Sequence, residues 1–249
     1  MREAETIGER TLLNNCVRQF ILRFDLFPSG DFRFEEIINR IAARFDRTEK
    51  RIVNVIGFQL KDGKSEAAKT EEVDYVLISD VNNLSLTFSK TQIAFWLESK
   101  QYRDNSVYKE LFIEIRNVYS LLLPETKTRR IGMRFINDFK CDSKREIKKI
   151  LGAKTASIVL GMLGGDSLSR VIAQEEYNLA DKKVRVQYGV PNKYYPSVIS
   201  NFDLLLDIDS YVDQPVSVSD WTDTLSVLNH AAYELFVRSM NAEYLVRLK

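Results

Sequence analysis

Hydrophobic and polar residues alternate along two segments of the chain, 129–137 and 203–213. Such alternation places one kind of residue on each face of an extended strand and predicts a strand that is buried on one side. In the first segment Ile131, Met133 and Phe135 alternate with Arg130 and Arg134. In the second segment the two faces carry Asp203, Asp207, Asp209 and Asp213 on one side and Leu204, Leu206, Ile208 and Val212 on the other. The opposite charges of the two polar faces predict that both strands belong to one sheet.

The same periodicities predict an ordered series of elements in the first half of the chain. Strands are predicted where residues alternate, and helices where apolar residues recur at three- and four-residue spacing. A proline at position 124 ends the last helix of this half. The predicted elements are a strand at 16–26, a helix at 34–45, strands at 51–60, 73–79, 84–88 and 92–98, and a helix at 105–123.

The second half repeats this order. Its predicted elements are a strand at 129–137, a basic helix at 144–151, strands at 168–177, 183–190 and 203–212, and a helix at 220–240, with 160–166 as a glycine-rich turn. An offset of 111 residues places Arg23 on Arg134. We therefore expect an α+β fold of two related halves, 1–126 and 127–249, each an antiparallel sheet with a short helix and a long closing helix on one face. The pattern leaves open whether the halves share one continuous sheet.

Composition and charge narrow the class of protein. The chain has 249 residues, of which 45% are hydrophobic and 29% charged, as in a soluble protein that buries a core. The first six residues include three charged ones and lack an apolar stretch, and the longest apolar run, 156–163, falls short of the ~20 residues needed to cross a bilayer. We therefore expect a cytoplasmic protein. Cys16 and Cys141 lack the spacing of metal ligands, so reduced, structural cysteines and no metal or other cofactor are expected.

Three short motifs resemble a known family. They are Arg-Ile-Gly-Met-Arg-Phe-Ile-Asn at 130–137, Leu-Asp-Ile-Asp at 206–209, and Leu-Asn-His at 228–230 with Phe236 in the last helix. The chain resembles in these motifs, and in the order of its segments, a sporadically distributed family of prokaryotic proteins of roughly this length. That family has no established activity and no assigned catalytic residues. The resemblance implies a prokaryotic origin, a cytoplasmic setting and, from the patchy distribution, an accessory role in defence or stress.

The charged strand residues are the first candidate binding site. Arg130 and Arg134 opposite Asp207 and Asp209 favour a cross-strand ion-pair network, in which each exposed pair contributes roughly 0.2–1 kcal/mol and fixes the strand register. The alternative is a site in which the arginines bind a phosphate or carboxylate, or the aspartates bind a divalent cation such as Mg²⁺. His230 is the only histidine and a candidate general base. We favour for it a structural role, with a bond from the last helix across to the sheet.

A basic segment is the second candidate. Ten Lys or Arg residues and three acidic ones lie between positions 127 and 154. Lys144, Arg145, Lys148 and Lys149 within it flank apolar residues and could contact an anionic membrane or RNA. The interpretation we favour is a surface helix that packs its apolar side inward and leaves its basic side chains in water.

No catalytic signature accompanies these features. We therefore expect a non-enzymatic recognition or adaptor protein that works with a protein partner, and homo-oligomers are compatible with this role. One alternative is a small-molecule or lipid-binding protein, with its ligand between a long helix and the curved sheet and with peripheral membrane contact. Another is a metal hydrolase that uses Asp207 and Asp209.

Overall fold

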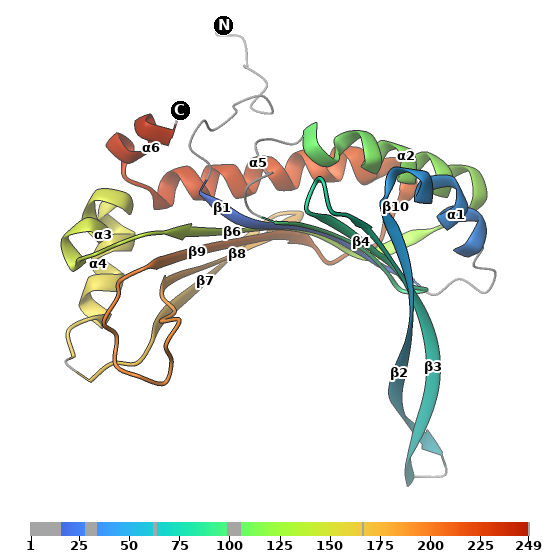
Figure 1. The fold of residues 1–249 in the computed structure, drawn as a ribbon, viewed down its shortest axis with the longest axis horizontal. Helices are drawn as coiled ribbons and strands as arrows, with labels where there is room; N and C mark the ends of the chain where they lie inside the picture. Colours follow the sequence, from blue (N-terminus) through green and yellow to red (C-terminus); the bar gives the residue numbers. More distant parts are fainter. Residues whose placement is uncertain (1–15, 28–33, 62–63, 99–105, 166, 249) are drawn as a thin grey trace, which may run out of the picture.

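The protein is built around one antiparallel sheet. The computed structural model describes residues 16–27, 34–61, 64–98, 106–165 and 167–248, with side chains described except at 34, 55–61, 64–70 and 106–108. The sheet arches across the whole molecule (Figure 1). Its strands are β1 (Val17–Leu26), β2 (Arg47–Lys61), β3 (Lys64–Ser79), β4 (Leu84–Phe88), β5 (Gln92–Glu98), β6 (Lys127–Phe139), β7 (Val171–Leu179), β8 (Lys182–Val190), β9 (Leu204–Val212) and the short β10 (Val216–Ser217).

The two halves of the chain meet at the centre of this sheet. The strand order is β2-β3-β4-β5-β1-β6-β9-β8-β7, and β10 pairs with β6. At the junction Leu22 of β1 lies opposite Met133 of β6. Within the first half, β1 is followed outward by β5, β4, β3 and β2. Within the second half, β6 is followed outward by β9, β8 and β7, so in both halves the outer strands appear in reverse sequence order. The α+β class is confirmed, and the sheet is continuous from one half to the other.

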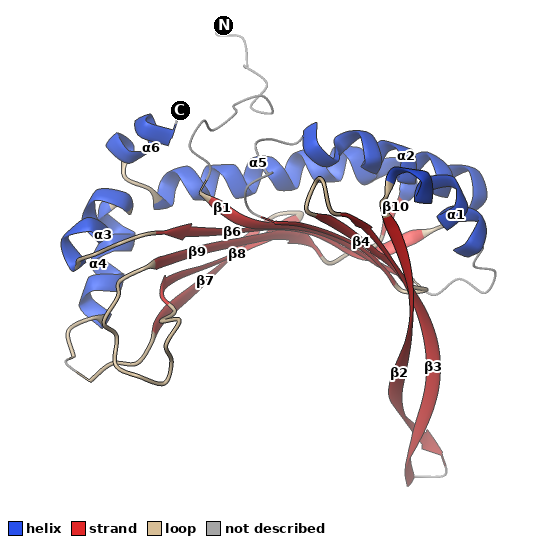
Figure 2. Ribbon diagram, in the orientation of Figure 1, coloured by secondary structure: helices blue, strands red, loops and turns tan. Residues whose placement is uncertain are grey.

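Helices cover one face of the sheet and its ends. They are α1 (Phe34–Ile41), followed by a 3₁₀ turn at Ala42–Arg44, α2 (Ser106–Leu122), α3 (Lys144–Ile150), α4 (Ala153–Met162), a 3₁₀ turn at Val218–Asp220, α5 (Trp221–Ser239) and α6 (Ala242–Leu248). The long helices α2 and α5 lie on the convex face, α1 lies beside α2, and α3, α4 and α6 gather near the opposite end (Figure 2). In the described part of the chain, no helix combines the length and apolar character that crossing a membrane requires.

Two apolar clusters fill the space between the helices and the sheet, one in each half. Helix α5 contributes to both, because Trp221 and Leu228 pack in the first cluster and Leu235 and Phe236 in the second. The Trp221 ring lies with its centroid 4.7 Å from that of Phe24 on β1 and 5.6 Å from that of Tyr119 on α2. The last long helix therefore completes the core of the first half as well as that of its own.

The largest difference from the sequence expectation is the length of β2 and β3. The sequence predicts strands at 51–60 and 73–79, whereas the structure pairs Arg47–Lys61 with Lys64–Ser79 along their whole length. This hairpin projects as a two-stranded arm from the open side of the sheet (Figure 1). No other described element forms a layer over much of the arm (Figure 1), so its residues need not alternate. In the sequence the charged positions from 61 to 72 therefore resemble a loop.

Helix α4 is a second difference, because the sequence predicts a turn at 160–166 but the helix continues to Met162. Ala156, Val159 and Leu163 recur at helical spacing and are buried, while Gly161 lies on the exposed side. Burial of that apolar side therefore outweighs the weak helix propensity of one glycine. The short elements β10 and α6 were also not predicted, since neither is long enough to show a period.

Candidate functional site

The concave face of the sheet carries the charged residues that the sequence singles out. Side chains that point away from α2 and α5 on the central strands surround a shallow hollow of about 420 Å³. The residues that line it are Ile21, Arg23, Asp25, Trp96, Arg130, Gly132, Arg134, Arg185, Asp209 and Tyr211. We call this feature the arginine hollow.

Ion pairs organise the arginine hollow. Arg134 binds Asp207 with two hydrogen bonds, from Nε at 2.9 Å and from Nη2 at 2.6 Å. Asp209 accepts hydrogen bonds from Nη2 of Arg130 at 3.0 Å and Nη2 of Arg185 at 2.8 Å. The prediction that the two charged faces lie in one sheet is confirmed, and their residues are in direct contact. Hydrogen bonding to Asp207 raises the pKa of the Arg134 guanidinium above its usual value, so Arg134 stays charged.

Gly132 explains the spacing of the arginine motif. Arg130 bends across position 132, where a Cβ atom would lie 2.7 Å from its Nη1 atom. The guanidinium of Arg130 also lies 4.7 Å from the centre of the Tyr211 ring, and Tyr211 is the β9 residue opposite Gly132. A glycine between the two arginines therefore leaves the surface clear, so that Arg130 stacks on Tyr211 and reaches Asp209.

Gly132→Ala is expected to displace the Arg130 side chain while the fold stays intact. The obstructed atoms are the far end of a flexible side chain, and Asp209 keeps its bond to Arg185. We expect the free energy of unfolding to fall by less than about 1 kcal/mol. Urea unfolding should show the decrease in the wild-type background and none when Arg130 is already alanine. An equal loss in both backgrounds would contradict this account of the motif.

Seven residues that line the hollow were not predicted as site residues, namely Ile21, Arg23, Asp25, Trp96, Gly132, Arg185 and Tyr211. The alternation of their strands already indicated which residues face away from the core. On β1, for example, Phe20, Leu22 and Phe24 point to the core, while Ile21 and Arg23 point to the open face. The 111-residue offset also aligned Arg23 with Arg134. What the sequence lacks is the strand order, which brings β1, β5 and β8 beside the two charged strands.

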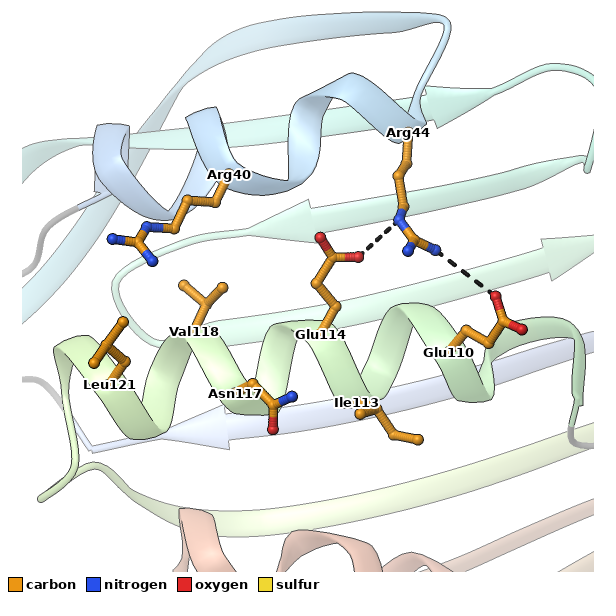
Figure 3. Close-up of a pocket in the computed structure, with 8 residues that line it drawn as sticks. All are labelled: Arg40, Arg44, Glu110, Ile113, Glu114, Asn117, Val118 and Leu121. Carbon is orange, nitrogen blue, oxygen red and sulfur yellow. Dashed lines mark ion pairs between the residues drawn. The ribbon is translucent and has the colours of Figure 1, made fainter.

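The described surface also has a hollow next to the arginine hollow and another on the helix side. One, of about 330 Å³, shares Trp96 with the arginine hollow and extends to Asp80 and Asn83 at the root of the arm. The other, of about 380 Å³, lies between α1 and α2 (Figure 3). There Arg44 points between two carboxylates, with its Nε atom 2.7 Å from Glu114 and its Nη1 atom 3.9 Å from Glu110. This α1–α2 groove provides an ion pair on the helix side that can be compared with those of the arginine hollow.

His230 does not have the structural role that the sequence suggested. It is exposed on α5 and forms a pair with Glu234 one turn later in the same helix, with 3.3 Å between Nε2 and Oε1. A bond across to the sheet was therefore the wrong expectation, because position 230 lies on the side of α5 that faces away from the two apolar clusters. The histidine is also separate from the arginine hollow, which lies on the other side of the sheet.

The aspartates are not arranged as a metal site. Among the residues that the structure describes, no group of three or more His, Cys, Asp or Glu side chains lies close enough to hold an ion. Asp207 and Asp209 are each paired with arginine instead. A divalent cation there would have to compete with guanidinium groups that are already in place.

The four candidate residues of the basic segment lie on α3, at one end of the sheet. Ile147 and Ile150 are buried, while Lys144, Arg145, Lys148 and Lys149 lie on the exposed side. The Nζ atom of Lys144 donates a hydrogen bond of 2.7 Å to the carbonyl of Leu163, so this lysine anchors α3 to the end of α4. The arrangement agrees with the favoured interpretation of a surface helix with its apolar side inward.

Replacing Arg145, Lys148 and Lys149 together with glutamine should change the free energy of unfolding by no more than about 0.5 kcal/mol per site, because their side chains are solvated. Lys144→Gln should cost more, since it removes the bond to the carbonyl of Leu163. Thermal unfolding of the triple variant and of Lys144→Gln tests this difference. If the triple variant lost salt-sensitive binding to anionic vesicles or RNA, α3 would be a contact surface after all.

The comparisons with known proteins add no family. Neither a scan against models of protein families nor a search of curated proteins finds a match to this chain. The resemblance described above therefore rests on its three motifs. The first motif lies on β6 and the second on β9, the two strands that form ion pairs in the arginine hollow. The third motif lies on α5.

Proposed function

We propose that this chain is a non-enzymatic recognition or adaptor protein that binds a protein partner on the open, concave face of its sheet. The observation that carries the proposal is the centre of that face, over which no helix of the described residues lies. The helices pack on the convex side, whereas Arg23, Trp96 and Arg134 of the open side remain about two-fifths exposed. A central sheet face with large, partly exposed side chains is a surface suited to contact with another molecule.

The kinds of residue on this face favour protein over nucleic acid. Trp, Tyr and Arg are enriched at the energetic centres of protein interfaces, whereas Lys is depleted there. The arginine hollow contains four arginines, one tryptophan and one tyrosine, and no lysine is among the residues that line it. Aspartates alternate with the arginines, so a densely charged phosphate backbone would also meet negative side chains.

The shape of the open face supports the same proposal. The β2–β3 arm projects at one end of the sheet, and the loop at 191–203 extends on the same side at the other end (Figure 1). That loop carries Tyr194 and Tyr195, each 57% exposed, with Arg170 lying 4.4 Å from the centre of the Tyr195 ring. A partner seated on the sheet would therefore meet projecting structure at both ends.

The two alternative functions have less support. A lipid between the long helix and the sheet would need space that the two apolar clusters occupy. A metal hydrolase would need free carboxylates, but Asp207 and Asp209 each bind arginine. We further propose a cytoplasmic setting and, from the motif resemblance, a role in a prokaryotic accessory system of defence or stress.

The fold also favours an internal duplication, with halves at 1–126 and 127–249. Each half has an opening strand, one or two short helices, a run of antiparallel strands and a long helix. The strand order outward from β1 matches that outward from β6, although the path from β6 has one strand fewer because β10 lies off it. We propose that the open face formed when two copies of one unit joined their opening strands.

Photocrosslinking in the native cell tests the proposed face. A photoreactive amino acid at Thr87 or Gln187, which point away from the helices on β4 and β8, should capture a discrete protein. Matched positions on the helix side are Leu121 and Val246, which are 65% and 70% exposed. The proposal predicts a crosslinked protein from the first two positions only. Equal crosslinks from both faces, none from the open face, or nucleic acid as the captured molecule would overturn it.

A further inference from the structure

Arginines and carboxylates are interspersed over the arginine hollow. Four arginines line it, and the carboxylates of Asp25, Asp207 and Asp209 lie in or beside it. A fourth carboxylate lies at its border, since Glu176 of β7 is opposite Arg185 and accepts a hydrogen bond of 3.2 Å from the hydroxyl of Tyr211. A polyanion would therefore place several negative charges beside these carboxylates, whereas a single carboxylate adds only one.

Two of the guanidinium groups have donors to spare. Arg23 donates from Nε to Asp25 at 2.7 Å, and Arg185 donates from Nη2 to Asp209 at 2.8 Å. Within the described part of the chain, each of them pairs with that one carboxylate. A guanidinium carries five N–H groups, and these two side chains are 44% and 38% exposed. Unused donors of both therefore remain accessible in the hollow.

An apolar wall borders these donors. Trp96 of β5 lies directly opposite Ile21 of β1, and both residues line the hollow. Ile21 is only 8% exposed, whereas Trp96 is 38% exposed and also borders the neighbouring hollow toward the arm. A group bound by the arginines would therefore have an indole surface at its side, and this surface can accept an apolar side chain of the same ligand.

We infer that the arginine hollow binds an acidic side chain, Asp or Glu, of an extended segment of a partner protein, with a neighbouring apolar side chain of that segment on Trp96. This inference rests on the proposed function and specifies its chemistry. A carboxylate is a planar monoanion that matches the fork of a guanidinium, so one such group can use the free donors of Arg23 or Arg185. The apolar neighbour uses the exposed indole.

Trp96 itself reports on binding. The chain contains two tryptophans, and Trp221 is fully buried in the core. In protein labelled with 5-fluorotryptophan, ¹⁹F NMR should give one resonance for each, and Trp96→Phe assigns them. The probes are acetylated and amidated hexapeptides with one Glu and one Leu at varied spacing, their Gln counterparts, inorganic phosphate, and oligouridine. We expect the best Glu peptides to shift the Trp96 resonance and their Gln counterparts to bind about tenfold more weakly or worse.

Arg185→Gln is the variant that tests the arginines with least risk to the fold, because Asp209 keeps Arg130 as a partner. It should lower the affinity for the Glu peptides about tenfold. Trp96→Ala should reduce the preference for peptides in which Leu stands near Glu. The matched control is Arg44→Gln in the α1–α2 groove, which should leave peptide binding unchanged. Equal binding of Glu and Gln peptides, or tighter binding of oligouridine or phosphate with the same dependence on Arg185, would overturn the inference.

The crosslinking experiment separates failure of this inference from failure of the proposed function. A partner protein that crosslinks at Thr87 with the same yield in the Arg185→Gln variant would refute the acidic contact and leave the open face as the binding surface. A yield that falls about tenfold in this variant, but not in Arg44→Gln, would support both. Absence of any protein crosslink would refute the proposed function whatever the peptides do.

Discussion

Arg134→Ala should lower the free energy of unfolding by about 3 kcal/mol, near the low end of the cost of removing one partner from a buried ion pair. The loss arises because Asp207, whose side chain is only 5% exposed, keeps its charge without the two hydrogen bonds that Arg134 donates. Partial access of water to the vacated position keeps the cost from being larger. Urea unfolding monitored by circular dichroism measures it.

A double-mutant cycle distinguishes this mechanism from simple loss of packing. Asp207→Asn removes the stranded charge, so Arg134→Ala should cost much less in that background, with a coupling of at least about 1 kcal/mol. The exposed pair of Lys140 and Asp203, which joins the same two strand regions, is the matched control and should be close to additive. Additive effects at Arg134 and Asp207 would show that their bonds contribute little in solution.

Gly189→Ala should destabilise the protein by about 3 kcal/mol or more, since it adds backbone strain to a steric overlap. Gly189 has φ of 151°, which residues with a side chain rarely adopt. A Cβ atom at this position would lie 2.2 Å from the carbonyl oxygen of Val171 on the neighbouring strand. Neither the strained φ nor the overlap with the Val171 carbonyl can be relieved by moving a side chain. The variant must therefore separate β7 from β8 at this point. Thermal unfolding should show a lower midpoint.

Gly161→Ala is the matched control for this substitution. Gly161 lies within α4, and apart from its chain neighbours and the backbone of the same helix no described atom lies within 4 Å of a Cβ atom at this position. Alanine should be neutral or raise the free energy of unfolding by up to about 1 kcal/mol, because it favours helix over the unfolded chain. A similar loss of stability in both variants would indicate that the special conformation of Gly189 does not account for its effect.

Elements with one buried face were predictable from the sequence, and those without one were not. β4 and β9 alternate between core and open face, so their bounds follow from the pattern. The long helices α2 and α5 show their buried stripes equally clearly. The extension of β2 and β3 into an arm has no such pattern, because pairing between the two strands provides its regular structure.

The candidate site was predictable only in part, for a related reason. The opposite charges at Arg134 and Asp207 predicted their contact, because both lie on strands with a clear polar face. Arg185 lies on a strand whose basic residues alternate with valines, and Trp96 on a strand with no such alternation of charge, but only the strand order brings both residues to the same hollow. For His230 the sequence predicted a bond to the sheet that the structure does not have. The residue lies on the outer side of α5 and pairs with Glu234 of the same helix.

The position of Trp221 and Leu228 has a consequence for how the chain is made. Both residues belong to the core of the first half, yet they are synthesised roughly 100 residues after that half is complete. At ordinary translation rates the ribosome needs on the order of 5–20 s for this interval. Throughout it, Phe24 and Tyr119 lack the ring that covers them in the finished protein. We therefore expect the nascent chain to expose an aggregation-prone apolar surface to chaperones and neighbouring chains until α5 has been synthesised.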